Sequence, residues 1–313
     1  MATSIILDCD PGHDDAIAIL MALGSPEIDL IGITTVGGNH SLDKVTYNAR
    51  AVCEVAGAPD VPVHAGARRP LIREAIDAAG IHGQTGLDGV ELPAPTRELS
   101  QWHAVEWMIG EIMTRDPGTV VLVPTGPLTN IALAARLEPR IVDRVKQVVL
   151  MGGAHGPGNA TPVAEFNILC DPEAAHIVFN ETWPVTMIGL DVTHRALCTH
   201  EVQERLCAAN PRLAGVVNGL MDFFRAAYRD QQAFADPPTH DPCAVAYVID
   251  PSIVETRRAP LDVEIRGRIT YGMTVADMRG EEDPECRTRI GTGLDVDRFW
   301  GAVEDALRRL PQT

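Results

Sequence analysis

Short runs of consecutive apolar residues alternate with helix-length amphipathic segments from the first residues to about residue 190. The runs are rich in β-branched side chains, and we predict strands at residues 4–10, 28–36, 61–66, 119–125, 145–153 and 183–191. Strands that are apolar on both faces and separated by helices are typical of a parallel sheet covered on both sides. We therefore predict an α/β fold with an open, mostly parallel sheet and helices on both faces.

The pattern changes after about residue 191. We predict helices at about 200–232, 241–249 and 295–310, and two strand-like runs between about 260 and 276. No linker rich in Pro, Gly or Ser divides the chain, so we expect residues 1–313 to form one domain. The Gly- and Pro-containing stretch from about 66 to 100 is predicted to be a long loop, and such loops are often functional.

The charge balance excludes some partners. The 313 residues include 43 acidic and 26 basic side chains, a formal net charge of −17. This field repels nucleic-acid phosphates and anionic membranes, so we expect neither as a partner. The seven cysteines include no C-x-x-C pair and are interpreted as reduced thiols of a cytoplasmic protein. The apolar run before Asp8 has no basic region ahead of it and is predicted to be a strand, not a signal peptide.

An acidic cluster follows the first predicted strand. Asp8 and Asp10 project from the same face of that strand, and Asp14 and Asp15 open the next helix. Carboxylates this close raise one another's pKa unless a positive charge lies among them. The nearest basic side chain in sequence is Lys44, so a bound cation is the natural compensator. Because only oxygen donors gather here, Ca²⁺ or Mg²⁺ is preferred over Zn²⁺.

Two roles without a bound metal compete for the same residues. A single Asp at such a place is more often a helix cap or a turn residue. An Asp-x-Asp sequence after an apolar strand also begins phosphatases of the haloacid-dehalogenase type. Those enzymes need a small or hydroxyl residue soon after the second Asp, whereas Pro11 and Gly12 follow Asp10. We therefore favour the metal site.

Polar residues also follow other predicted strands. Asn39 comes after the second strand. Thr125 lies in a turn whose backbone carbonyl is a possible ligand for a hard cation, although on sequence alone a simple turn is the better interpretation. Asn159, Glu165 and Asn167 follow the fifth strand, and no capping role accounts for them in the sequence. They form a loop set of two amides and a carboxylate that is suited to binding several hydroxyl groups.

The last candidates lie toward the carboxyl half of the chain. Asp241 precedes Pro242 and is a good helix N-cap, but His240 beside it can carry a proton near neutral pH. Tyr228 and Gln232 are one helical turn apart and are candidates for a ligand pocket; an amphipathic surface helix accounts for them equally well.

Seven short segments together resemble one known family. They are Asp8 to Ala16 (DCDPGHDDA), Val36 to Asn39 (VGGN), His82-Gly83, Thr125 to Pro127 (TGP), Met151 to Gly153 (MGG), Glu165 to Asn167 (EFN) and His240 to Pro242 (HDP). In this order, and over essentially the whole chain, they resemble the inosine-uridine preferring nucleoside hydrolases. The resemblance implies a nucleoside hydrolase fold with a Rossmann-like core, one Ca²⁺, and hydrolysis of the N-glycosidic bond of ribonucleosides to free base and ribose.

The resemblance also implies roles for individual residues. Calcium is expected to bind Asp10, Asp15, the Thr125 carbonyl and Asp241. Asp10 is then also the base that deprotonates the attacking water, and His240 is expected to lie toward the nucleobase. Because the departing base must also be stabilised, we predict that His240 is the acid that protonates it. The ribose 2′- and 3′-hydroxyls are expected to meet Asp14, Asn39, Asn167 and Asp241. The sugar and its 5′-hydroxyl are expected to be surrounded by Met151, Asn159, Glu165 and Phe166, with His82 toward the base.

Some properties stay open at this point. The family includes homodimers and homotetramers, and the resemblance does not choose between them. It also leaves undecided whether purines, pyrimidines or both are cleaved. An alternative function is a calcium-dependent nucleoside- or ribose-binding protein without turnover; the presence of Asp10 and His240 argues against it. The charge of Glu165 and the acidic field favour nucleosides over nucleotides as substrates.

Overall fold

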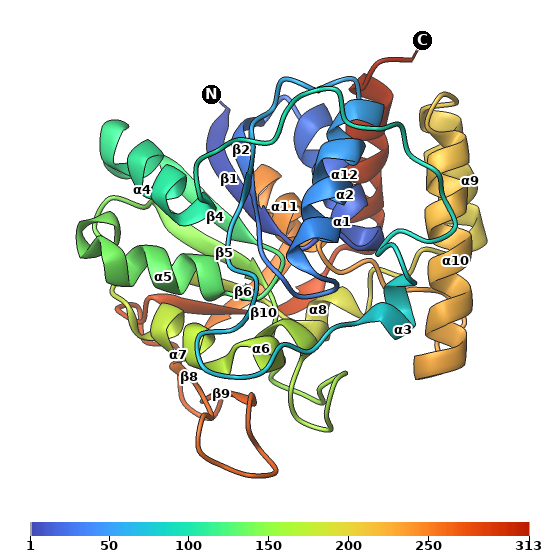
Figure 1. The fold of residues 1–313 in the computed structure, drawn as a ribbon. Helices are drawn as coiled ribbons and strands as arrows, with labels where there is room; N and C mark the ends of the chain where they lie inside the picture. The colour runs from blue at the N-terminus through green and yellow to red at the C-terminus, as the bar shows by residue number, and fades with distance from the viewer. Residues whose placement is uncertain (1, 313) are drawn as a thin grey trace.

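A computed structural model describes residues 2–312, and an eight-stranded sheet runs through its centre (Figure 1). The strand order is β3-β2-β1-β4-β5-β6-β10-β7, and only β7 runs antiparallel to its neighbour. The strands are β1 (Thr3–Cys9), β2 (Ile28–Thr35), β3 (Val63–Ala65), β4 (Val120–Pro124), β5 (Gln147–Met151), β6 (Val185–Ile188), β7 (Val254–Arg258) and β10 (Thr288–Leu294). The predicted α/β fold and mostly parallel sheet are confirmed.

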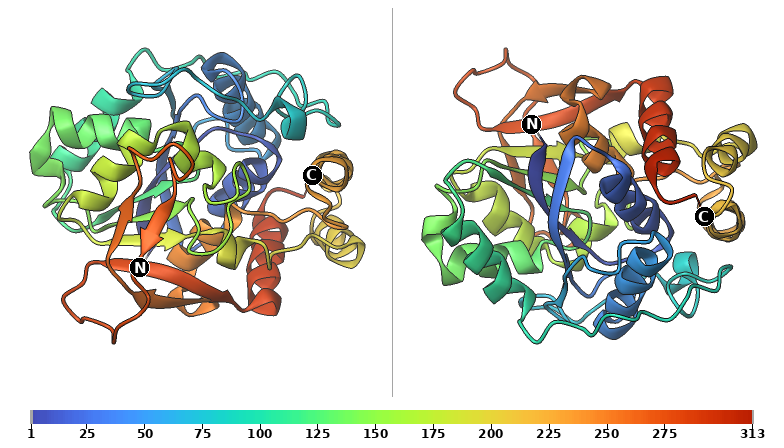
Figure 2. Two further views of the ribbon diagram at one scale, coloured as in Figure 1. Left: turned by 90° about the horizontal axis from the view of Figure 1, so that it is seen from below. Right: turned by 90° about the horizontal axis from the view of Figure 1, so that it is seen from above.

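Helices cover both faces of this sheet (Figure 2). One face packs against α1 (His13–Gly24), α2 (Leu42–Val55), α11 (Pro242–Ile249) and α12 (Val296–Arg309). The other packs against α4 (Ala104–Thr114), α5 (Thr129–Leu137) and α7 (Pro172–Asn180). Because side chains alternate along a strand, Ile5 and Leu7 enter the first layer while Ile6 enters the second. This is why β1 has apolar residues at consecutive positions.

The remaining elements lie around this core. They are α3 (Ala79–His82), α6 (Phe166–Cys170), α8 (Leu190–Thr193), the helices α9 (His200–Ala209) and α10 (Ala214–Gln232), and a small sheet of β8 (Leu261–Val263) and β9 (Thr274–Ala276). Apart from α3, residues 66–100 contain no regular helix or strand, as the composition predicted. Among residues 2–312, none of the helices combines the length and the apolar character that a membrane span requires.

The second half of the chain differs in detail from the prediction. The two runs between residues 260 and 276 pair with each other as β8 and β9, outside the central sheet. Strands β7 and β10 were not predicted from the sequence. Strand β10 is hard to recognise because Gly291 and Gly293 interrupt it, and glycine is unfavourable in strands. Gly291 is needed, however, since a Cβ there would lie 2.6 Å from Val192 Cγ2.

The helical segments predicted over residues 200–232 are confirmed, and they are two helices, α9 and α10. Helix α9 ends before Asn210-Pro211, because helical dihedral angles are unfavourable for a residue that precedes proline. Asn210 is fully buried, and its side-chain amide donates to the Leu307 carbonyl of α12 at 2.9 Å. The residue between the two helices therefore attaches them to α12 and the core.

The sheet order explains where a ligand should bind. Strand β1 lies between β2 and β4, so the chain winds one way toward β3 and the other way toward β6. Open α/β sheets bind ligands at such a reversal, beyond the carboxyl ends of the strands. The acidic cluster after β1 lies at this point.

A backbone constraint at the end of α10 provides a stability test. Ala233 caps this helix with φ 58°, a left-handed conformation that costs a residue with a Cβ about 1–2 kcal/mol. We expect Ala233→Gly to raise the free energy of unfolding by about 0.5–1 kcal/mol, after the greater unfolded-state entropy of glycine is allowed for. The measurement is urea unfolding of the two proteins. The matched reverse change is Gly118→Ala, at φ 74° with no atom within 4 Å of the new Cβ, and it should destabilise.

Candidate functional site

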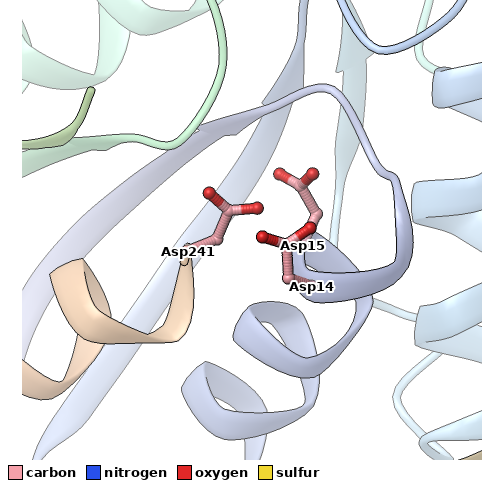
Figure 3. A group of neighbouring side chains, drawn as sticks. All are labelled: Asp14, Asp15 and Asp241. Carbon is pink, nitrogen blue, oxygen red and sulfur yellow. The ribbon is translucent and has the colours of Figure 1, made fainter. Parts of the chain in front are cut away.

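Buried carboxyl groups converge at the carboxyl edge of the sheet. Asp10 follows β1, Asp14 and Asp15 form the first turn of α1, and Asp241 precedes α11. All four are at most 4% exposed. One carboxylate oxygen from each of Asp14, Asp15 and Asp241 lies within 4.8 Å of the others, and Figure 3 shows these side chains converging from two elements far apart in sequence.

Asp10 lies beside this group rather than within it. One of its oxygens, Oδ2, accepts the Asn39 backbone N–H at 2.6 Å, while Oδ1 is buried and has no hydrogen-bond partner among residues 2–312. Its surroundings require glycine: a Cβ on Gly38 would lie 2.1 Å from Oδ2, and one on Gly126 would lie 2.6 Å from Oδ1. A buried carboxylate oxygen without a partner calls for a ligand. A cation fits this position.

The electrostatics of the cluster favour the same conclusion. Burial and then the charge of Asp15 raise the pKa of Asp10 well above its ordinary value, and they raise that of Asp14 to about 7. Burial, followed by the charges of Asp14, Asp15 and Asp10, likewise raises the pKa of Asp241. No Lys or Arg lines the adjoining pocket in the described chain. A divalent cation would relieve this repulsion and keep the carboxylates ionised.

Asp15 and Thr125 are held to each other. The Thr125 hydroxyl donates to Asp15 Oδ1 at 2.8 Å, and the Asn39 side-chain amide donates to Asp15 Oδ2 at 3.2 Å. The Thr125 carbonyl accepts from Asn167 Nδ2 at 2.8 Å and keeps a second lone pair for a metal. The role expected from the sequence concerned only this carbonyl, and the part played by the hydroxyl was not predicted.

Asp8 belongs to the structure that supports the site. Its Oδ1 accepts from the Thr34 hydroxyl at 2.6 Å and from the Asn130 side-chain amide at 2.8 Å. Asn130 also donates to the Thr35 carbonyl at 3.0 Å. Asp8 therefore ties the ends of β1 and β2 to α5, and it is not part of the group of converging oxygens.

A pocket opens above the cluster. Asp10 and Asp15 are fully buried and do not line it. All other predicted site residues do: Asp14, Asn39, His82, Thr125, Met151, Asn159, Glu165, Phe166, Asn167, Tyr228, Gln232, His240 and Asp241. Four further lining residues were not predicted, namely Ala78, Ile81, Ala160 and Phe224. Phe224 could have been found, because it lies one helical turn before Tyr228 on α10.

The set of Asn159, Glu165 and Asn167 does have local structural roles, contrary to the expectation from the sequence. Glu165 caps α6: its carboxylate accepts the backbone N–H groups of Asn167 at 2.8 Å, Gly153 at 2.9 Å and Ile168 at 3.1 Å. Asn159 Oδ1 accepts the Phe166 N–H at 3.0 Å. Burial raises the pKa of Glu165, and these N–H bonds counteract that effect. The residues still line the pocket, so their capping bonds fix a polar wall.

Asp241 differs from a simple capping residue. It occupies the N-cap position of α11, but its side chain makes no capping hydrogen bond. One of its carboxylate oxygens instead lies within 4.8 Å of oxygens of Asp14 and Asp15. A capping role alone is therefore insufficient to account for a buried Asp at this position.

His240 is bonded through both ring nitrogens. Nδ1 is 2.7 Å from the Thr193 hydroxyl and Nε2 is 2.7 Å from the Tyr228 hydroxyl. Its backbone N–H donates to Asp14 at 3.1 Å. Burial, followed by the charge of His194, lowers the pKa of His240 to about 3, so the ring is neutral at neutral pH. Tyr228 is 4% exposed, so it does not belong to a solvent-facing helix surface.

Comparisons with known proteins agree with this geometry. The sequence profile of the family described as inosine-uridine preferring nucleoside hydrolase matches residues 5–301. The chain is similar to the inosine-uridine preferring nucleoside hydrolases of Crithidia fasciculata and Leishmania major, with 53% and 54% identity over 311 residues and 99% of each chain covered. It also resembles the solved structure of a purine-preferring ribonucleoside hydrolase from Gardnerella vaginalis, with a TM-score of 0.92, 36% identity and 98% of both chains covered.

The repulsion within the cluster can be measured without substrate. In the presence of a chelator, we expect Asp241→Asn to increase the free energy of unfolding by about 1 kcal/mol, because one charge is removed from a buried group of carboxylates that lie within 4.8 Å of one another. A divalent cation should stabilise the wild type more than the variant. Urea unfolding measures both effects. Asp60→Asn, at an exposed position, is the control: it should change neither the stability in chelator nor the stabilisation by the cation. A variant that is less stable than wild type in chelator would contradict this account.

Proposed function

The chain belongs to the inosine-uridine preferring nucleoside hydrolase family, and from this premise we propose how its residues carry out the reaction. It is a ribonucleoside hydrolase that splits the N-glycosidic bond to release a free base and ribose. The binding-only alternative is therefore not retained. The observation that carries the proposed mechanism is the buried Oδ1 of Asp10, which has no hydrogen-bond partner among residues 2–312 and lies beside three converging carboxyl groups.

The proposed metal is Ca²⁺. Asp10, Asp15, Asp241 and the Thr125 carbonyl would hold it, and a set of oxygen donors with several carboxylates suits this ion. When bound, calcium makes a coordinated water a better nucleophile at neutral pH. Asp10 would then accept the proton of the attacking water, because its Oδ1 has no hydrogen-bond partner among residues 2–312 and keeps a lone pair beside the one that the metal would take.

The proposed sugar contacts follow from the hydrogen bonds already present. The Asn39 side-chain N–H groups are used by the Asp10 carbonyl and Asp15, and those of Asn167 by the carbonyls of Thr125 and Met151. Each amide therefore keeps Oδ1 to accept from a ribose hydroxyl. Asp14 and Asp241 supply negative charge near the ring, which stabilises the positive charge that develops there as the glycosidic bond breaks.

We propose that His240 assists protonation of the leaving base by Tyr228. With Nδ1 accepting from the Thr193 hydroxyl, His240 Nε2–H donates to the Tyr228 oxygen and stabilises the negative charge left there when the Tyr228 hydroxyl gives its proton to the base. Tyr228 then regains, through solvent, the proton that the attacking water gave to Asp10. This path needs no imidazolium ion, in keeping with the low pKa of His240. The Tyr228 hydroxyl, rather than the imidazole itself, is then the immediate proton donor.

The finer biological assignments rest on weaker features. Free thiols at all seven cysteines support a cytoplasmic location. A homodimer or homotetramer is proposed on the family resemblance. The net charge of −17 supports the expected lack of nucleic-acid partners. One sheet that takes strands from both halves of the chain supports a single domain over residues 1–313.

The substrate and metal are tested together. We expect the protein to release base from inosine and uridine, the nucleosides in the names of its relatives, and to lose this activity in a chelator. Calcium should restore activity more fully than magnesium. The 2′-deoxynucleosides should react at least ~10²-fold more slowly, because a site built for a hydroxyl is left with unpaired polar groups. Undiminished activity after complete metal removal would contradict the proposal.

The proton path is tested by changing the leaving group. We expect Tyr228→Phe and His240→Ala each to lower kcat for inosine by about 10²- to 10⁴-fold. Both variants should hydrolyse a p-nitrophenyl riboside at rates near wild type, because nitrophenolate leaves without a proton. Equal losses on both substrates would show that these residues serve binding or folding instead.

A further inference from the structure

His13 is a buried polar residue in the first turn of α1 to which the calcium and ribose contacts assign no role. It is fully buried beside Asp14 and Asp15. Its ring stacks on those of His82 at 5.3 Å, Phe223 at 5.2 Å and Phe224 at 5.2 Å between centroids. Of these neighbours, His82 and Phe224 line the pocket. His13 thus lies directly behind the wall of the pocket that faces α10.

A hydrogen bond between the two rings fixes His82 to His13. Nε2 of His13 donates to the Asp88 carbonyl at 2.9 Å, since a carbonyl can only accept, so Nδ1 of the neutral His13 ring is an acceptor. It accepts from His82 Nδ1–H at 3.0 Å, and the His13 backbone nitrogen lies 3.3 Å from the same His82 atom. With Nδ1 of His82 engaged, only its Nε2 remains to meet a ligand.

The surrounding backbone leaves this arrangement little freedom. A Cβ on Gly12 would lie 2.5 Å from the His82 ring, so the chain entering α1 touches the ring directly. Asn48 of α2 donates to the Thr85 carbonyl at 3.1 Å, and Lys44 donates to that of Gln84. The segment 82–88 is therefore attached to both α1 and α2. In Figure 1, α3 and this segment pass beside α10.

We propose that His13 is a positioning residue for the nucleobase side of the pocket. It holds His82 and Phe224 so that the base meets a wall that is already formed. The first turn of α1 then helps to position both halves of the substrate. Asp14 and Asp15 contact the sugar and the metal, and His13 positions the base through His82 and Phe224. This inference rests on the proposed function only in placing the base against His82.

The test compares base-dependent and base-independent binding in His13→Leu. We expect KM for inosine and uridine to rise about 10-fold with kcat within about threefold of wild type, because the freed wall must be ordered when the base binds. Inhibition by 1,4-anhydro-D-ribitol, which has the ribose ring without a base, should be unchanged, as should the calcium requirement. Deuterium uptake of peptides covering residues 79–90 should rise.

Two further variants sharpen the result. His13→Asn should restore part of the wild-type KM, because its amide reaches the place of Nδ1, and it carries the same test if the leucine variant folds poorly. His64→Leu is the matched control: His64 is also buried, stacks on Trp107 and lies outside the pocket, so KM and loop exchange should not change.

The inference is overturned if His13→Leu behaves like His64→Leu. It is also overturned if the affinities for 1,4-anhydro-D-ribitol and for calcium fall as much as the affinity for the nucleosides does. Failure of the proposed function gives a different result, since the wild type itself would then lack calcium-dependent nucleoside hydrolysis.

Discussion

The structure depends on the mutual repulsion of carboxylates held out of water. Asp10, Asp14, Asp15 and Asp241 are buried together, and among the described residues no Lys or Arg lines the adjoining pocket to offset their charge. Such a group is unfavourable in the apo protein and becomes favourable when a dication binds. Stability, metal binding and the charge available to stabilise a cationic ribosyl group therefore have one origin.

The fold provides the rigidity that this arrangement requires. Parallel strands bring Asp10 and Thr125 to the same edge, and the end of β1 is tied to its neighbours through Asp8. Gly38 and Gly126 allow the backbone to approach Asp10 more closely than any side chain would permit. Sheet geometry thus places the proposed ligands, so that little reorganisation would be needed when an ion or the substrate binds.

Local features of the site could be predicted from the sequence because their cause is local. Asp10, Asp14 and Asp15 are close in sequence, and the apolar strands are recognisable by their consecutive apolar residues. The proximity of Asp241 is a tertiary fact, and here the family resemblance supplied what spacing alone could not. Glu165 was misjudged because its cap lies on a helix of only five residues, and β10 was missed because packing against Val192 requires a glycine within a strand. His13 shows its role only when α1, residues 82–88 and α10 are placed together.

A crystal structure of the protein with calcium tests the central claim most directly. The account predicts one ion bonded to Asp10 Oδ1, Asp15, Asp241 and the Thr125 carbonyl, at about 2.3–2.6 Å. An ion bound elsewhere, or Asp10 Oδ1 still without a partner at saturating calcium, would contradict it.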